Sequence, residues 1–133
     1  MSRVFISYAR DDRQMASIVA EALQAAGHSV FLDQFLVGGT DFKSEIYNSL
    51  MQSTAVIVLL SGNARKSEWV QDEIATAIAQ GTKIVPILLD GEAKNNLVWP
   101  LVATRQAISA VGGFDDRSIR QVVASVETKD PHP

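Results

Sequence analysis

Two residues of one predicted helix could contribute to a binding site. Trp69 and Glu73 are four positions apart, so their side chains share one face of that helix. At 3.6 residues per turn, this face is turned by about 100° from the apolar stripe of the helix and can border a cleft outside the core. A carboxylate and an aromatic ring would bring charge and a stacking surface to such a cleft. Tyr8 and Phe35, at the ends of two predicted strands, could add further aromatic surface.

Simpler explanations of the same residue types stay open at this point. A helix glutamate is most often a solvated surface residue, and a tryptophan near the start of a helix more often packs than binds a ligand. The pair Asp11-Asp12 is most simply a helix cap. The pair Gly38-Gly39 is most simply a turn. Spacing by itself therefore does not identify an enzyme.

The residue types and motifs that the sequence lacks exclude several classes of site. The chain has no cysteine, which excludes disulfides, thiolate metal sites and a cysteine nucleophile. It has neither a P-loop nor a Gly-x-Gly-x-x-Gly turn after the first predicted strand. His28 and His132 are isolated in the sequence, so we expect no metal site and no histidine-based triad. A response-regulator receiver would need an aspartate at the end of the third strand, where Ser61 stands.

Charge and hydropathy argue against nucleic acid and membrane partners. Lys and Arg number 12 against 15 Asp and Glu, which gives a net charge of −3 and no basic cluster. No apolar run approaches the roughly 20 residues that span a bilayer. The N-terminus lacks the basic and apolar regions of a signal peptide. We therefore predict a cytoplasmic protein that binds neither nucleic acid nor membrane.

The apolar pattern predicts strands and helices in alternation. Short apolar runs, typical of strands buried on both faces, occur at residues 4–6, 30–32, 55–60, 84–89 and, weakly, 107–108. Apolar residues at helical spacing lie between these runs, and Gly27 and Gly81 should end two of the helices. Pro86 predicts that the fourth strand lies near a sheet edge or a bulge. The order predicts an α/β fold, a flavodoxin-like three-layer sandwich with a mainly parallel, five-stranded sheet.

The length of 133 residues fits one domain, which we place at residues 1–127. The polar tail, residues 128–133, is expected to be a linker or an end. The first helix should bury six apolar residues, namely Met15, Ile18, Val19, Ala22, Leu23 and Ala26. Ligands bind outside the carboxyl ends of the strands in such folds, which predicts a site among residues 7–12, 33–35, 61–63 and the start of the third helix.

Four segments together resemble the Toll/interleukin receptor (TIR) domain family. The run Val4–Asp12 is similar to the opening box of that family, and Val30–Asp33 with the Gly38-Gly39 loop resembles its second strand and BB loop. The run Ser53–Ser61 resembles its third strand, and Ser67-x-Trp69-Val70-x-x-Glu73 resembles the signature of its third helix. The segments occur in the order and spacing of the family, from about residue 3 to about residue 125, which makes the resemblance specific.

The resemblance implies two alternative functions. Some TIR domains cleave NAD+ at the nicotinamide–ribose bond, and others act without catalysis by associating with further TIR domains, including bacterial mimics of host signalling proteins. The similarity to the bacterial branch implies an NAD+ glycohydrolase that releases nicotinamide and either ADP-ribose or a cyclic ADP-ribose product, in antiphage defence. NAD+ would then be the substrate and not a cofactor. A small-molecule-binding flavodoxin-like domain of another family is a third alternative.

The resemblance also implies roles for particular residues. Glu73 is the implied catalytic residue, and the implied substrate-binding residues are Tyr8, Arg10, Asp33, Phe35 and Trp69. The implied BB loop contains Leu36, Val37, Gly38, Gly39 and Phe42. This loop would pack on a neighbouring protomer, so that head-to-tail self-assembly activates the enzyme, and a fused or separate sensor domain would be a further partner. Because Glu73 is expected outside the core, its replacement by glutamine should change stability by less than about 0.5 kcal/mol.

Overall fold

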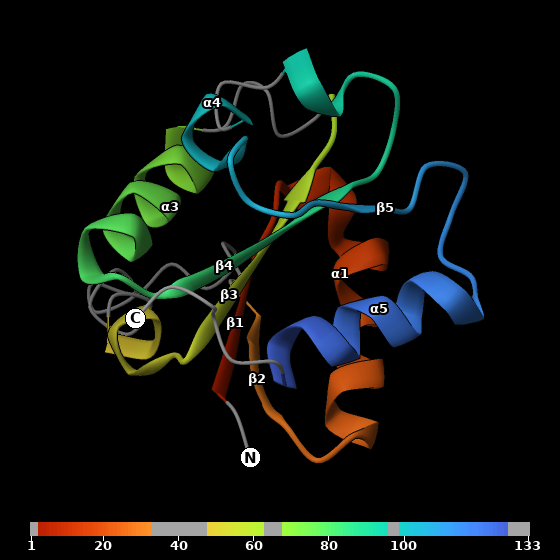
Figure 1. Cartoon of the computed structure of the whole chain (residues 1–133), viewed down its shortest axis with the longest axis horizontal. Coiled ribbons are helices and arrows are strands. Elements are labelled where there is room, and N and C mark those ends of the chain that lie inside the picture. The colour runs from red at the N-terminus through yellow and green to blue at the C-terminus, as the bar shows by residue number, and fades with distance from the viewer. Residues whose placement is uncertain (1–2, 33–47, 63–67, 96–98, 128–133) are drawn as a thin grey trace.

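A computed structural model describes residues 3–32, 48–62, 68–95 and 99–127. In chain order the elements are β1 (Arg3–Ser7), the 3-10 turn η1 (Arg10–Asp12), α1 (Arg13–Ala25), β2 (Ser29–Leu32), β3 (Ala55–Leu60), α3 (Glu68–Gln80), β4 (Lys83–Leu88), the 3-10 turn η3 (Ala93–Asn95), α4 (Trp99–Val102), β5 (Ile108–Ser109) and α5 (Asp116–Glu127). Residues 48–52 are also helical. Figure 1 shows the strands crossing the middle of the molecule with helices beside them, and each of the predicted strands is present.

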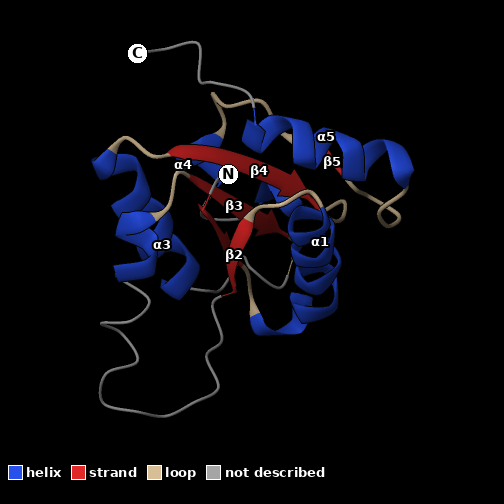
Figure 2. Ribbon diagram, turned by 90° about the horizontal axis from the view of Figure 1, so that it is seen from below, coloured by secondary structure: helices blue, strands red, loops and turns tan. Residues whose placement is uncertain are grey.

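The five strands form one parallel sheet in the order β2-β1-β3-β4-β5. The chain first moves outward from β1 to β2, then returns past β1 to β3 and continues to β5, so the winding reverses between β1 and β3. Figure 2 shows α3 on one side of the strands and α1 with α5 on the other. This is the flavodoxin-like α/β arrangement predicted from the sequence. In such folds ligands bind outside the carboxyl ends of the strands at the reversal.

The two faces of the sheet bury separate apolar cores. Alternate residues of β1 divide between them, since Val4 and Ile6 pack with α1 and α5 while Phe5 packs with α3. Every residue of β3 is buried, as expected for a central parallel strand. At the edge of the sheet, the ring of Phe31 in β2 stacks on Phe5 with 5.4 Å between the ring centroids. The central strands are thus held between two packed layers, which fixes the position of their carboxyl ends.

Helix α1 buries a stripe that agrees only in part with the predicted one, since Val19 and Leu23 are buried and Met15 packs against the core as expected. Its buried residues are Ala16, Val19, Ala20 and Leu23. Ile18 is 41% exposed, and Ala26 is exposed as well. The buried positions have the spacing of one helix face, and the two alanines on it allow the helix to lie close to the sheet. Ile18 is turned by about 100° from Val19, so its hydrophobicity does not bring it inside.

Two glycines end helices α1 and α3, as predicted. The backbone φ angle is +92° at Gly27 and +78° at Gly81, in the region that other residues rarely adopt. After α1, the N–H of His28 donates to the carbonyl of Leu23 at 3.0 Å, and the N–H of Gly27 donates to that of Gln24 at 3.0 Å. This pair of bonds is a Schellman motif, which satisfies two carbonyls at the end of the helix and redirects the chain toward β2.

Pro86 lies in β4, the strand next to the short edge strand β5. Strand β5 pairs with Ile87 and Leu88 of β4. The carbonyl of Leu88 accepts from the N–H of Ala110 at 2.8 Å, so the backbone groups of Leu88 face β5. Backbone groups alternate in direction along a strand, so Pro86 faces the same side, just before that pairing begins. The missing N–H of proline therefore removes no bond to β3, which agrees with the predicted position near an edge.

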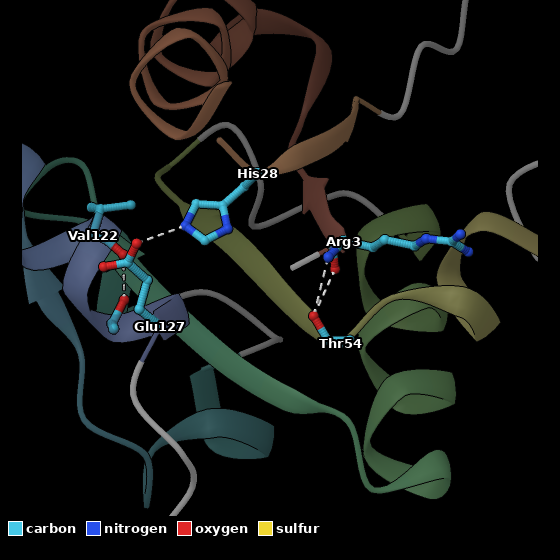
Figure 3. Close-up of polar contacts among 6 residues, drawn as sticks. Arg3, His28, Thr54, Val122 and Glu127 are labelled. Carbon is cyan, nitrogen blue, oxygen red and sulfur yellow. Dashed lines mark hydrogen bonds and ion pairs between the residues drawn. The ribbon is translucent and has the colours of Figure 1, made fainter. Parts of the chain in front are cut away.

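Polar contacts join the elements at the amino-terminal edge of the sheet, opposite the predicted site (Figure 3). The side-chain oxygen of Thr54 accepts from the N–H of Arg3 at 3.2 Å, and the N–H of Thr54 donates to the carbonyl of Arg3 at 2.8 Å. His28, just before β2, places its Nε2 atom 3.0 Å from Oε2 of Glu127 at the end of α5. His28 therefore has a structural partner at this edge.

Candidate functional site

Two serines mark the carboxyl ends of the neighbouring strands β1 and β3. Ser7 is the last residue of β1, and Ser61 directly follows β3. They are 0% and 1% exposed, respectively. Ser7 lies two residues after Phe5 and so points to the α3 face, whereas Ser61 lies two residues after Leu59 and so points to the α1 face. A buried hydroxyl requires a hydrogen-bond partner, and each of these serines bonds to a carboxylate.

On the α3 face, the Oγ–H group of Ser7 donates a hydrogen bond to Oε1 of Glu73 at 2.6 Å. Glu73 is only 5% exposed, and the next residue of α3, Ile74, is fully buried. The short distance is typical of a hydroxyl that donates to a carboxylate. The bond joins β1 to α3 across 66 positions of the sequence. It therefore fixes the carboxylate of α3 against the end of a central strand.

The prediction that Glu73 lies outside the core was wrong. The geometry of α3 turns Glu73 away from the apolar stripe, which is why the sequence predicted an open position. However, β1 extends as far as Ser7 and brings a hydroxyl to the carboxylate. This bond offsets part of the cost of removing a carboxylate from water, so Glu73 can be buried at the boundary of the core.

On the α1 face, the Oγ–H group of Ser61 donates to Oδ2 of Asp12 at 2.5 Å. Asp12 is 7% exposed. It occupies the N-cap position of α1 but makes no side-chain capping hydrogen bond. The prediction of a cap was therefore correct for the position and wrong for the side chain. The carboxylate turns toward the sheet because the hydroxyl at the end of β3 is a donor within its reach.

The chain that leaves β3 is also held by the loop after β4. The N–H of Gly62 donates to Oδ2 of Asp90 at 3.1 Å, and Oδ1 of Asp90 accepts from the N–H of Glu92 at 2.9 Å. A Cβ atom built on Gly62 would lie 3.3 Å from Cβ of Glu92, so a side chain there would be crowded. The exit of β3 is therefore fixed by both Asp12 and Asp90.

The other predicted site residues divide into those with described positions and those without. Tyr8 is 2% exposed and belongs to the core between the sheet and α1, so its ring is packed. Arg10 begins η1 and Trp69 is the second residue of α3, while their side chains lie outside the described part. The residues that lie wholly outside it are Asp33, Phe35, Leu36, Val37, Gly38, Gly39 and Phe42.

Ser7 and Ser61 lie within the site region predicted from the sequence, but no partner was predicted for either, and Asp90 was not predicted at all. A signal was present, because a small polar residue follows an unbroken apolar run both at Ser7 and at Ser61. A polar residue that continues a buried strand must satisfy its hydroxyl. Here the partner comes from the segment that follows the neighbouring strand, α3 for Ser7 and η1 for Ser61. Which residues become those partners depends on long-range contacts, so it follows only from the three-dimensional structure.

The described ranges contain no group of three or more His, Asp or Glu side chains that could hold a metal ion. Over the same ranges, no helix has the length and apolar character to cross a bilayer. Glu73 and Asp12 bond to serines on opposite faces of the sheet. Ser7 therefore holds the carboxyl group of Glu73 at the carboxyl end of β1. When ionised, a carboxylate held in this way can stabilise a positive transition state without reorganising.

Comparison with known proteins gives consistent matches. Residues 4–123 match the family model of the TIR domain. NAD(+) hydrolase SARM1 of Danio rerio is 34% identical over 106 residues, which are 73% of this chain and 14% of that protein. NAD(+) hydrolase TcpA of Theionarchaea archaeon (strain DG-70-1) is 29% identical over 119 residues, 84% of this chain and 36% of that protein. The TIR domains of the activated Roq1 resistosome match with a TM-score of 0.72 and 21% identity, over 95% of this chain and 99% of that chain.

The extent of these matches limits what each of them shows. The chain spans 14% and 36% of the two relatives, so those similarities concern one region of longer proteins. The structural match, at 21% identity, bears on the fold and confirms the predicted TIR arrangement of strands and helices. The family model extends from β1 into α5 and so covers most of the sequence. The chain therefore belongs to the TIR domain family.

Proposed function

We propose that this chain is an NAD+ glycohydrolase that cleaves the bond between nicotinamide and ribose, with Glu73 as the catalytic carboxylate. The observation that carries the proposal is that Glu73 is 5% exposed and is held by Ser7 at the carboxyl end of β1. Ligands bind at this position in parallel sheets whose winding reverses there. The names of two relatives, both NAD(+) hydrolases, support the same substrate.

A fixed carboxylate suits this reaction. When the bond between ribose C1′ and the ring nitrogen of nicotinamide breaks, the bonding electron pair leaves with nicotinamide, which departs as a neutral molecule. The leaving group needs no general acid, unlike the sugar oxygen that a two-carboxylate glycosidase must protonate. The ribose acquires oxocarbenium character, which the carboxylate stabilises. Water then bonds to C1′ and loses a proton to give ADP-ribose, whereas attack by another group of the same molecule gives a cyclic product.

Further contacts to NAD+ are proposed for Trp69, Arg10, Asp33 and Phe35. Trp69 precedes Glu73 by about one helical turn of α3, a spacing that lets an aromatic ring lie beside the reacting ribose. Arg10 begins the turn that follows β1, at the same edge of the sheet as Ser7. The burial of Tyr8 favours a packing role for that residue in place of the stacking role.

Activity is further proposed to depend on self-assembly. The loop from Phe35 to Phe42 would pack on a neighbouring protomer, and head-to-tail contacts of this kind repeat without closing. The setting that we propose is a cytoplasmic bacterial defence against phage, in which a sensor domain or partner triggers the assembly. Specific activity should then rise with protein concentration and with tethering. If specific activity does not change with protein concentration, either with or without tethering, activity does not depend on assembly.

The direct test of the proposed function is to incubate concentrated protein with NAD+ and to measure free nicotinamide. Release by the wild type and its loss in Glu73→Gln would support the glycohydrolase. Separation of the remaining product would distinguish linear from cyclic ADP-ribose. If neither concentrated nor tethered protein releases nicotinamide, while the protein binds other TIR domains, the non-catalytic adaptor is the function.

A further inference from the structure

Ser7 is a polar residue in a strand that otherwise suits apolar side chains. It is 0% exposed, and the three residues before it in β1 are apolar and buried. Its register partner on β3 is Val58, which is also fully buried. An unbonded hydroxyl in such surroundings would cost free energy relative to an apolar residue of the same size. The hydroxyl is therefore accounted for by the bond that it makes to Oε1 of Glu73 at 2.6 Å.

The two ends of this bond differ in rigidity. Ser7 belongs to β1, which pairs with β2 on one side and β3 on the other. Glu73 reaches the bond through a side chain with several rotatable torsions, whose carboxylate could otherwise turn about the end of its stem. A short, charge-assisted bond from a strand with one possible position selects one of these orientations. The direction of the Glu73 carboxylate is therefore set by the sheet and not only by α3.

We propose that Ser7 is the positioning residue of the catalytic carboxylate. Its hydroxyl holds Glu73 in the orientation that faces the charge developing on the ribose, and Ser7 itself takes no part in bond breaking. The inference rests on the proposed NAD+ cleavage. It predicts that the hydroxyl at position 7 contributes to turnover, whereas the size of the side chain contributes only to packing.

The test compares Ser7→Thr with Ser7→Val in the full chain. Threonine and valine have nearly the same shape and both suit strands, but only threonine keeps the hydroxyl. The rate constant kcat and the KM for NAD+ are measured at a protein concentration where the wild type is active. The kcat of Ser7→Thr should stay within about threefold of the wild-type value. The kcat of Ser7→Val should fall by about 10–100-fold, as for groups that orient a reacting residue. The KM of both variants should change by less than about threefold, because substrate binding does not need this hydroxyl.

A matched control separates positioning from general destabilisation. Ser118 is also buried, at 6% exposure, and its N–H and hydroxyl bond to Asp115 at the start of α5. Ser118→Ala should lower the urea midpoint and leave kcat at the wild-type value. If the β-branched residues prevent folding at position 7, Ser7→Cys and Ser7→Ala replace them, since cysteine keeps a weak donor and alanine keeps none.

The outcomes separate this inference from the proposed function. A folded Ser7→Val with the kcat of Ser7→Thr overturns the positioning role alone, provided that the wild type is active and Glu73→Gln is not. A rise in KM without a fall in kcat overturns it as well, since the hydroxyl would then serve binding. Absence of nicotinamide release from the wild type overturns the proposed function, and the inference with it.

Discussion

Ser61, the residue after β3, donates a hydrogen bond at 2.5 Å to Asp12, the residue that directly precedes α1. Ser7, at the end of β1, donates at 2.6 Å to Glu73 in the helix that follows β3. The end of β1 therefore holds a carboxylate from α3, the helix that follows β3. The end of β3 holds a carboxylate from the turn that follows β1. Because β1 and β3 are also paired in the sheet, the crossed bonds tie the two halves of the fold together where the winding reverses.

Replacement of Ser61 by alanine should lower the free energy of unfolding by about 1–3 kcal/mol, the usual cost of taking a partner from a buried polar group. Asp12 is 7% exposed, so water can replace the lost donor only poorly. Urea unfolding followed by circular dichroism measures the change. Ser29→Ala, at an exposed position of β2, is the control and should stay within about 0.5 kcal/mol. Equal midpoints for Ser61→Ala and the wild type would show that the crossed bond adds no stability.

The sequence predicted the parts of the fold that depend on neighbours along the chain. The unbroken apolar run from Ala55 to Leu60 predicts a central strand, and Gly27 predicts a helix end, because both patterns are local. The stripe of α1 was predicted wrongly at Ile18 because the orientation of a helix depends on what fits between it and the sheet. The small side chains of Ala16 and Ala20 decide that orientation, and hydrophobicity alone does not rank them above isoleucine.

The sequence predicts where a ligand site would lie in the fold, but it does not predict which side chains meet there. Parallel winding predicts a site at the carboxyl ends of the central strands. The bonds that form it join residues 66 positions apart for Ser7 and Glu73 and 49 positions apart for Ser61 and Asp12. No local pattern encodes such pairs, so neither the burial of Glu73 nor the turn of Asp12 toward the sheet could be foreseen. The roles of Trp69 and of the loop from residue 35 to residue 42 stay predictions.

Substitution of Gly27 by alanine should lower the free energy of unfolding by about 1–2 kcal/mol, because its φ angle of +92° strains any residue that has a Cβ atom. Gly91→Ala is a matched control. In both cases the added Cβ atom would meet nothing within 4 Å, but Gly91 lacks the positive φ angle. The control should therefore change stability by less than about 0.5 kcal/mol. Similar losses in the two variants, measured by urea unfolding, would refute backbone strain as the cause.

Asp115 and Ser118 cap the start of α5 reciprocally. The N–H of Ser118 donates to Oδ1 of Asp115 at 2.8 Å, and the N–H of Asp115 donates to Oγ of Ser118 at 2.9 Å. The N–H of Ser118 first, and its hydroxyl second, lower the pKa of the Asp115 carboxyl below its ordinary value of 3.8. These bonds favour the ionised form, so the carboxylate stabilises the folded state when it is charged.

The capping contribution of Asp115 should therefore be fully present above the unfolded pKa, about 3.8, and should disappear as the pH falls through the lower folded pKa. Asp115→Asn keeps a capping oxygen but does not titrate. The stability advantage of the wild type over this variant should shrink between about pH 6 and about pH 2, with the loss confined to the acid end. Urea unfolding at a series of pH values measures the advantage. A constant difference over that range would contradict the linkage.

Glu73→Gln should remove NAD+ cleavage while keeping the fold. The amide oxygen of glutamine can still accept the hydrogen bond from Ser7, but the negative charge is lost. Removal of one preorganised electrostatic group typically lowers kcat by about 10²–10³-fold. Glu73 is only 5% exposed, so the stability change of less than about 0.5 kcal/mol that is usual for surface substitutions does not apply to Glu73→Gln. A charge-assisted bond becomes a neutral one, so we expect the free energy of unfolding to fall by about 1 kcal/mol.

The carboxylates beside Glu73 on α3 test whether the position or only the charge matters. Asp72 is exposed and is turned by about 100° from Glu73. Asp72→Asn removes the same charge one residue earlier and should keep most activity and the wild-type urea midpoint, and Glu68→Gln should also keep most activity. Both controls lower the net negative charge as much as Glu73→Gln does, so a general electrostatic effect on NAD+ binding would appear in all three variants. A loss of nicotinamide release in Asp72→Asn or Glu68→Gln, with full release by Glu73→Gln, would assign catalysis to a different carboxylate of this helix.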